Sequence, residues 1–407
     1  MKNVLAVIVI GVLFAGCKKD DSPTAQTEVV PPWSTGQSAE AVFGHTTFTA
    51  AGTDSVLQST IAGPWGLAVS GSGALFVVDQ RGHRVLRFND ASSKASGANA
   101  DGVFGQSNFT DRIWNYNIGG STPSPSGFET PVSIAVDPSG NLFVLDQGNS
   151  RVLRFNTAAS KPNGAAADGV IGQPDFTSKG FSTTAVGFFS PQGIAVDASG
   201  NLYVADGSNN RVLRFNNAAS KANGASADAV FGQTTFTSST SGVAADKMKN
   251  PTSVAVDKDG NLYVGERGNC RILIFLNASS KADGAAADIV LGKSDFADGS
   301  TPTDANRGNI YLPYAMAIDQ KNNLYVADGG FNRLLVFTNA PAKKNGDSAD
   351  AVIGKSNFTN GTITAATDNN IGQPYGVAVQ SSTGKLYVTC YSNSRVLRFQ
   401  AKSSLMP

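Results

Sequence analysis

The chain has 407 residues, a formal net charge of +1, 15% charged residues, 44 glycines and 23 phenylalanines. A charge balance this close to zero gives no basic field of the kind that a nucleic-acid or anionic-membrane surface needs, so we expect no nucleic-acid partner. Many aromatic residues among many glycines favour short strands joined by turns.

The first 16 residues have the pattern of a secretory signal peptide. Lys2 supplies a positive charge, and the apolar run of residues 4–14 is too short to span a bilayer as a helix. The run ends in LFAGC, residues 13–17, which resembles the lipobox of bacterial lipoproteins. The resemblance implies cleavage before Cys17 and lipidation of that cysteine. An ordinary secretory signal beside an unrelated cysteine is the alternative.

The segment that begins at Cys17 predicts a tether and a location. Residues 22–38 are rich in Pro, Ser, Thr and Gln and lack periodicity, which is typical of a flexible linker, so we expect a flexible tether over residues 17–38. The KKDD run of residues 18–21 resembles the signal that sends some lipoproteins to the outer leaflet of the outer membrane. We therefore expect contact with the outer membrane through the lipid anchor only, at the cell surface, with the periplasmic face as the alternative.

A unit of roughly 60 residues recurs along the rest of the chain. One copy reads GIAVD (193–197), LYVAD (202–206), RVLRF (211–215) and ADAVFG (227–232), with Gly- and Asn-rich turns between the runs. Short β-branched and aromatic runs separated by such turns predict a four-stranded antiparallel sheet. A proline precedes the first strand of each copy, and the six prolines are Pro64, Pro131, Pro191, Pro251, Pro313 and Pro374.

The number of strands predicts a closed ring. Six copies of the first three strands are present, but a fourth strand follows only the first five copies. The missing strand is AVFG at residues 41–44, ahead of the first copy. If it completes the last sheet, no edge between the chain ends stays open. We therefore predict an all-β protein, a six-bladed β-propeller over residues 39–399 with a tail at 400–407, and we expect a monomer.

The repeated pattern P-x-G-[IV]-A-V-D-x-x-G-N-L-Y-V-A-D-x-x-N-x-R-[VI]-L-x-F resembles the NHL repeat, and the resemblance covers nearly the whole chain after the tether. It implies a propeller fold. It leaves the function open, because NHL-type propellers include RNA-binding proteins, protein-binding modules, lyases and sugar-lactone hydrolases. The function has to be argued from the site.

An acid and an arginine flank the turn between the second and third strands in five copies. Such a carboxylate can accept N–H groups of the turn and pair with the guanidinium. A catalytic group needed once would not recur around a ring, so we interpret these pairs as structural. The sixth copy has Cys390 before Arg395. The five pairs are Asp79/Arg84, Asp146/Arg151, Asp206/Arg211, Glu266/Arg271 and Asp328/Arg333.

A second repeated set of aspartates ends the first strand of copies two to five. An aspartate before a hairpin turn commonly caps that turn with its side chain, and this is the interpretation we favour. A ring of carboxylates that binds a cation at one channel mouth is the alternative, so these residues are weak metal candidates. The four are Asp137, Asp197, Asp257 and Asp319.

Non-repeated aromatic residues indicate a candidate ligand site. Aromatic residues directly follow the prolines of copies one, five and six, and closure of the ring makes these three copies neighbours. The turns between second and third strands of the same copies and an insertion at residues 111–130 supply further aromatic residues and a histidine. The alternative is that these rings pack beneath their own loops, which is how we interpret Phe181, Phe188 and Phe189. The candidates are Trp65, Tyr314, Tyr375, His83, Phe331, Tyr391, Trp114 and Tyr116.

Catalytic chemistry is hard to find in the sequence. The two histidines, His45 and His83, cannot supply a three-histidine zinc site, and no G-x-S-x-G motif is present. We therefore expect no catalytic residue and no cofactor. The sequence favours a binding or scaffold lipoprotein of the bacterial envelope that displays a propeller face to a glycan or an envelope protein. A metal-dependent hydrolase or lyase of the lactonase-like propeller type is the alternative.

Overall fold

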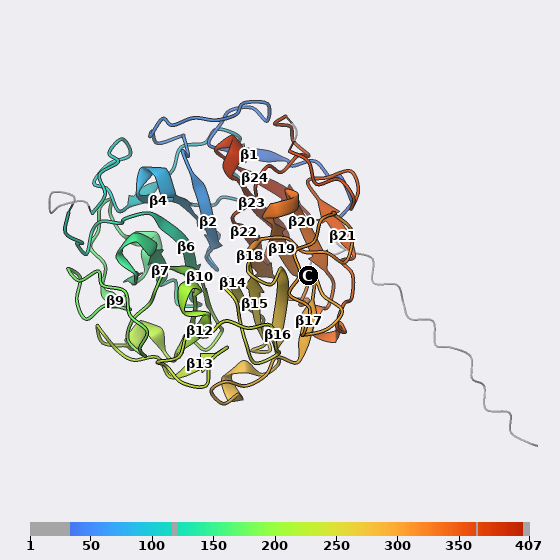
Figure 1. Cartoon of the computed structure of the whole chain (residues 1–407). Coiled ribbons are helices and arrows are strands. Elements are labelled where there is room, and N and C mark those ends of the chain that lie inside the picture. Colours follow the sequence, from blue (N-terminus) through green and yellow to red (C-terminus); the bar gives the residue numbers. More distant parts are fainter. Residues whose placement is uncertain (1–32, 116–120, 364, 402–407) are drawn as a thin grey trace, which may run out of the picture. The chain divides into compact units, whose positions relative to one another are not determined.

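The computed structural model describes residues 33–115, 121–363 and 365–401, and Figure 1 shows the ring that they form. Six sheets of four antiparallel strands follow one another around this ring in chain order. The predicted six-bladed β-propeller is therefore confirmed. Within these ranges, no helix is long and apolar enough to cross a membrane.

The strands are short and similar in length from blade to blade. Blades one and two hold β2 (Pro64–Val69), β3 (Leu75–Asp79), β4 (Arg84–Phe88), β5 (Gly102–Phe104), β6 (Pro131–Val136), β7 (Leu142–Asp146), β8 (Arg151–Phe155) and β9 (Gly169–Ile171). Blades three and four hold β10 (Pro191–Val196), β11 (Leu202–Asp206), β12 (Arg211–Phe215), β13 (Ala229–Phe231), β14 (Pro251–Val256), β15 (Leu262–Glu266), β16 (Arg271–Phe275) and β17 (Ile289–Leu291). Blades five and six hold β18 (Pro313–Ile318), β19 (Leu324–Asp328), β20 (Arg333–Phe337), β21 (Ala351–Ile353), β22 (Val377–Gln380), β23 (Lys385–Cys390), β24 (Arg395–Gln400) and β1 (Ala41–Phe43).

Single turns of 3₁₀ helix connect many of these strands. Between second and third strands they are η1 (Gln80–Gly82), η2 (Gln147–Asn149), η4 (Gly207–Asn209), η7 (Gly329–Phe331) and η9 (Tyr391–Asn393). After third strands they are η3 (Ala158–Ser160), η5 (Ala218–Ser220), η6 (Ala278–Ser280) and η8 (Ala340–Ala342).

The N-terminal strand closes the ring as predicted. β1 pairs antiparallel with β24, with Val42 opposite Leu397. Trp33 adds to the closure: it is 2% exposed, packs with core residues of blades five and six, and donates its Nε1–H to Tyr325 Oη at 3.0 Å. Part of the predicted tether, from Trp33 to residue 38, thus contacts the propeller ahead of the predicted boundary at residue 39.

The two faces of the ring are built from different connections. The top face carries the turns between second and third strands together with the loops that join one blade to the next. There the N–H of Glu129, in the loop entering blade two, donates to Asp146 Oδ1 at 2.6 Å. The bottom face carries the other turns and loops, where the N–H of Ala158 donates to the carbonyl of Gly140 at 3.0 Å. Top and bottom keep these meanings below.

The hydrophobic core lies between neighbouring blades. Because each sheet is covered on both sides, its strands carry apolar side chains on both faces. Leu142, Val144 and Leu153 of blade two pack with Phe76 and Phe104 of blade one, while other side chains of the same strands pack with blade three. The sandwiched blades hold the top-face loops in fixed positions.

Each acid–arginine pair is a buried ion pair beneath the top face. Arg211 Nε donates to Asp206 Oδ2 at 2.8 Å, and both side chains are fully buried. Asp206 Oδ1 accepts the N–H of Phe189 in the loop entering the blade, and Arg211 donates to the carbonyls of Thr184 and Phe236 in two loops. The pair therefore fastens loops to a blade. The equivalents are Asp79/Arg84, Asp146/Arg151, Glu266/Arg271 and Asp328/Arg333.

The repeated aspartates of the bottom face lie at their own turns. Asp197 Oδ1 accepts the N–H groups of Ser199 and Asn201, and Oδ2 accepts the Asn201 amide at 2.8 Å. The same contacts recur at Asp257 and Asp319, and Asp137 makes the two contacts with the asparagine, Asn141. Across the described ranges, no three His, Cys, Asp or Glu side chains are grouped so that they could hold a metal ion. The turn-capping interpretation accounts for these contacts.

Candidate functional site

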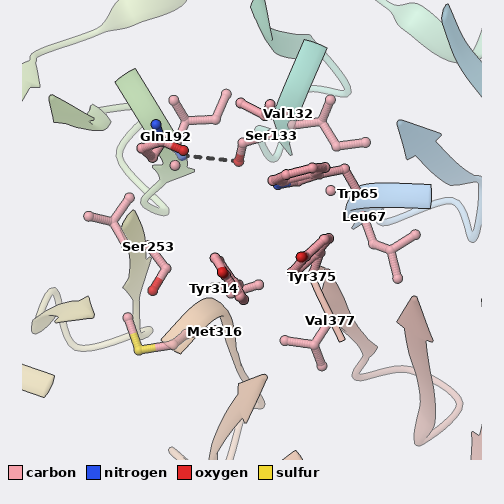
Figure 2. A pocket seen from close by; sticks show the side chains of 17 residues that line it. Trp65, Leu67, Val132, Ser133, Gln192, Ser253, Tyr314, Met316, Tyr375 and Val377 are labelled. Atoms are coloured by element: carbon pink, nitrogen blue, oxygen red, sulfur yellow. Dashed lines mark hydrogen bonds between the residues drawn. The ribbon is translucent and has the colours of Figure 1, made fainter. Parts of the chain in front are cut away.

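The first strands of the six blades line a narrow channel (Figure 2). Glycines bring these strands together: a Cβ atom at Gly376 would lie 2.1 Å from the Trp65 carbonyl oxygen, and one at Gly66 would lie 2.8 Å from that of Val132. The cavity between these strands has a volume of about 50 Å³. It has room for a few water molecules and not for a sugar or a peptide.

Four aromatic side chains meet at the top of this channel. The rings of Trp65 and Tyr375 lie 4.4 Å apart, centroid to centroid, at 30°, and Tyr314 meets Tyr375 edge-on at 4.4 Å and 78° (Figure 2). Tyr391 in η9 contacts Trp65 at 5.6 Å and Tyr375 at 4.8 Å. We call these four residues the aromatic cluster. All four are partly exposed, and all four are among the sequence candidates.

Small neighbours hold the aromatic cluster in place. A Cβ atom at Gly329 would lie 2.3 Å from Tyr314 Cδ2, so the ring lies directly on the backbone of η7. Thr389 Oγ1 accepts the N–H groups of Tyr375 and Gly376 at 3.0 and 2.6 Å, which fixes the segment before β22. The position of the rings therefore depends on the backbone beneath them.

One arginine contacts the aromatic cluster, and a second acts on it through its charge. Arg81 Cζ lies 5.1 Å from the centroid of the Tyr391 ring, and its Nη1 pairs with the exposed Asp54 at 2.8 Å. Arg267, on the turn of blade four, is exposed. Burial raises the pKa of Tyr375 to about 12, with Tyr314 adding to the rise and the positive charge of Arg267 opposing it. Neither arginine could be identified from the sequence, because turn residues do not reveal the direction of their side chains.

His83 and Trp114 form a separate pair on the same face. His83 Nδ1 accepts the N–H of Thr130 at 3.2 Å, and its ring centroid lies 6.3 Å from that of Trp114, which is 53% exposed. Burial lowers the pKa of His83, and the charge of Arg112 lowers it further. Tyr116, the other candidate of this insertion, lies outside the described residues.

Phe331 does not join the aromatic cluster. It is only 8% exposed, its ring lies 5.5 Å from Tyr311, and the guanidinium of Arg333 lies 5.1 Å from its centroid. The packing interpretation fits this residue better than a role in ligand binding, because its ring is covered by its own loops.

Exposed apolar side chains gather on the top face. Every strongly exposed large hydrophobic residue in the described part of the chain lies in a loop between blades. Phe181 and Phe189 stack at 4.6 Å, with Phe181 70% exposed, whereas Phe188 between them is buried. The packing interpretation of Phe181 was therefore wrong, and that of Phe188 was right. The exposed residues, which we call the apolar rim, are Leu57, Ile113, Trp114, Phe181, Phe189 and Ile363.

The bottom mouth of the channel has a different character. A cavity of about 320 Å³ there is lined by the four turn-capping aspartates together with Val136, Val196, Val256 and Ile318. The carboxylates already accept hydrogen bonds from their own turns.

The top face, by contrast, combines aromatic surface, apolar surface and guanidinium groups. This combination suits a ligand with apolar side chains and a negative charge.

Comparisons with known proteins support the fold. An NHL repeat model matches residues 128–155, 188–215 and 248–275, so blades two, three and four contain NHL repeats. No curated protein sequence matches the chain significantly.

Several solved structures are similar to the chain at low sequence identity. A structural genomics protein of unknown function from Bacteroides thetaiotaomicron is 15% identical over 88% of this chain and 75% of that chain, with a TM-score of 0.52. A streptogramin B lyase (12% identity, 86% and 95% coverage, TM-score 0.46) and a Xanthomonas campestris gluconolactonase (14%, 91% and 98%, TM-score 0.48) are also similar. At these identities the likeness concerns the fold alone.

Proposed function

We propose that this protein is a non-catalytic binding module of the bacterial envelope that holds a polypeptide partner on its top face. The observation that carries the proposal is the combination of the aromatic cluster, the Arg81 guanidinium against Tyr391 and the apolar rim on one face. Protein-binding surfaces are enriched in aromatic residues and arginine, and their strongest contacts are Trp, Tyr and Arg side chains.

The geometry favours a polypeptide over a glycan. Sugar recognition uses an open aromatic face, but Trp65 and Tyr375 lie against each other at 4.4 Å. The channel cavity of about 50 Å³ is too small for a sugar ring. The exposed rings, Trp114 and Phe181, lie on separate loops between blades. A broad partner surface would contact the cluster and the apolar rim together.

The envelope location is part of the proposal and rests on the N-terminal sequence. Lipidation of Cys17 would anchor the chain, and the tether would join the propeller at Trp33, which packs against Tyr325. Metabolic labelling with an alkyne fatty acid tests the anchor: we expect the label on the wild type and none on Cys17→Ser.

Site-specific photo-crosslinking on cells tests the binding face. A photoreactive amino acid at Trp114 or Phe181 of the full chain samples the top face, and one at Ser139 or Ser199 is a matched control on the bottom face. We expect protease-sensitive adducts of discrete mass from the top positions and none from the controls. Equal adducts from both faces, or none from the top, would contradict the proposal.

Two further measurements separate the proposal from its competitors. Arg267→Glu should reduce the adduct yield if the partner carries negative charge near the aromatic cluster. Binding to a glycan array that is lost in a Trp65→Ala/Tyr375→Ala variant would favour a sugar ligand. A rise in Tm on adding calcium would favour the metal-dependent hydrolase or lyase.

A further inference from the structure

Blade six departs from the other five at the acid–arginine pair. In blades one, two, three and five the arginine Nε donates to an aspartate oxygen at 2.7 or 2.8 Å, and in blade four Arg271 donates to Glu266. In blade six the β23–β24 register places Cys390 opposite Arg395, as Asp206 is opposite Arg211 in blade three. A thiol therefore occupies the position of a carboxylate.

Arg395 keeps every other contact of the repeated arginine. Its Nη atoms donate to the carbonyl oxygens of Phe48, Thr367 and Asn370, in the loops before and after the blade. Arg395 and Cys390 are both 0% exposed. Among the described residues, Arg395 Nε has no oxygen or nitrogen acceptor and faces only the Cys390 thiol, which sets it apart from its counterparts in the other five blades. A buried N–H of a charged group without an acceptor is costly.

A second buried cation shares a neighbour with Arg395, because both Lys355 and Arg395 donate to Asn370. Lys355 is 4% exposed, and its Nζ donates to the Thr362 carbonyl and to Asn370 Oδ1 at 3.1 Å. Its counterpart in the preceding blade, Lys293, has Asp298 at 3.9 Å. Within the described residues, neither Lys355 nor Arg395 forms an ion pair with a carboxylate. This part of blade six therefore has an excess of positive charge.

We propose that Cys390 is an oxidation site whose sulfinate form supplies the missing anion to Arg395. A sulfinate places two oxygens and one negative charge on the atom attached to Cβ, as an aspartate does. The oxidant is a hydroperoxide: the thiol and two molecules of hydrogen peroxide give the sulfinate, a proton and two molecules of water. Sulfur loses four electrons, and each peroxide takes two as its O–O bond breaks.

Burial raises the pKa of the Cys390 thiol, while Arg395, the Gly372 N–H and Lys355 oppose the rise. The first oxidation step is therefore slow and needs a local opening of the blade. Once the sulfinate has formed, the Arg395 Nε–H donates a hydrogen bond to it and holds it in place. Because η9 starts directly after Cys390 and carries Tyr391, the new ion pair would also fix one ring of the aromatic cluster.

The chain contains its own control for the test. Cys270 is also buried, at 2% exposure, but the neighbouring Arg271 is already paired with Glu266. After incubation of the folded full chain with hydrogen peroxide, peptide mass spectrometry should show addition of two oxygen atoms at Cys390 in several-fold excess over Cys270. Equal oxidation at both, or oxidation confined to Cys270, would overturn the proposal.

Thermal unfolding gives a second readout. Peroxide treatment should raise the Tm of a Cys270→Ser variant by a few degrees and leave that of a Cys270→Ser/Cys390→Ser variant unchanged. Cys390→Asp, which supplies the anion permanently, should raise Tm without peroxide, whereas Cys390→Ser should not. A fall in the Tm of the Cys270→Ser variant on oxidation would overturn the proposal. This result would count even if Cys390→Asp failed to fold, because the Cys270→Ser variant keeps the native Cys390.

Discussion

The bottom face repeats the same contacts in blade after blade, whereas the top face changes around the ring. On the bottom face, each loop after a third strand of blades one to five pairs a lysine with an aspartate seven residues later, at 2.8–3.0 Å. On the top face, blades one, five and six supply the aromatic cluster, while Gln192 and Thr252 take the corresponding positions in blades three and four.

This difference separates architecture from recognition. A contact that recurs around the ring is required by the blade itself. The acid–arginine pairs of five blades and the turn-capping aspartates of four blades are of this kind. A side chain that occurs in one sector only is not required by the repeat. The aromatic cluster, Arg81 and Arg267 are of this second kind, and they lie together at one mouth of the channel.

The largest effect is expected from a repeated pair beneath the top face. Asp206→Ala leaves the buried Arg211 Nε and the Phe189 N–H without their acceptor. We expect a loss of about 3–5 kcal/mol in the free energy of unfolding, because removing one partner of a buried pair leaves an uncompensated charge. The measurement is urea denaturation at neutral pH.

Asp197→Ala is the matched control on the bottom face. It removes the acceptor of two turn N–H groups, and it should cost about 1–2 kcal/mol. If Asp197→Ala costs as much as Asp206→Ala, the repeated contacts of the two faces are equally important and the distinction between them fails.

A smaller effect is expected from a glycine that supports the aromatic cluster. In Gly329→Ala the new methyl group would lie 2.3 Å from Tyr314 Cδ2, so the ring must move from its place against Tyr375. We expect a cost of about 1–3 kcal/mol from the added atom, with a changed near-ultraviolet circular dichroism spectrum. Gly71 lies on a bottom-face turn, and no described atom lies within 4 Å of a Cβ added there. Gly71→Ala should therefore change neither the free energy of unfolding nor the spectrum. An unchanged spectrum in Gly329→Ala would contradict the fixed position of the ring.

Repeat number, strand order and ring closure could be predicted from the sequence because they depend on periodic residues. Trp65, Tyr314 and Tyr375 could also be predicted to be neighbours, since each follows a proline at the start of a blade. Side-chain directions in non-repeated loops could not be predicted. Phe181 is exposed and Phe188 is buried, although both lie in one short insertion, because the conformation of that loop depends on tertiary contacts.

Carboxyl groups of the two faces should contribute to the free energy of unfolding with opposite dependence on pH. Burial raises the pKa of Glu266 to about 7 and that of Asp328 to about 6, against the charges of Arg271 and Arg333. The folded state then holds protons that the unfolded state releases, so this contribution is complete below the unfolded pKa values and is lost as pH rises toward about 7. Stability should therefore fall between about pH 5 and 7.5, and Glu266→Gln should flatten the slope.

On the bottom face the sign is reversed. Burial alone would raise the pKa of Asp168, but the Lys161 ammonium and the Asn156 N–H lower it on balance. Its contribution is present above the unfolded pKa near 3.9 and is lost as pH falls through the lower folded value. Asp168→Asn should therefore leave the slope of the free energy of unfolding against pH unchanged between about pH 5 and 7.5. An equal change of slope in Asp168→Asn and Glu266→Gln would show that the two faces do not differ in this respect.

The smallest effect on stability is expected at the apolar rim, where the effect on binding should be largest. Phe181→Ser changes a side chain that is 70% exposed, so the free energy of unfolding should change by no more than about 0.5 kcal/mol. Phe188→Ala, in the same loop, empties a buried site beside Phe215 and should cost about 3–5 kcal/mol. Crosslinking from Trp114 should weaken in Phe181→Ser at full stability. If it weakens only in variants that also lose stability, the rim acts through folding and contributes nothing to recognition.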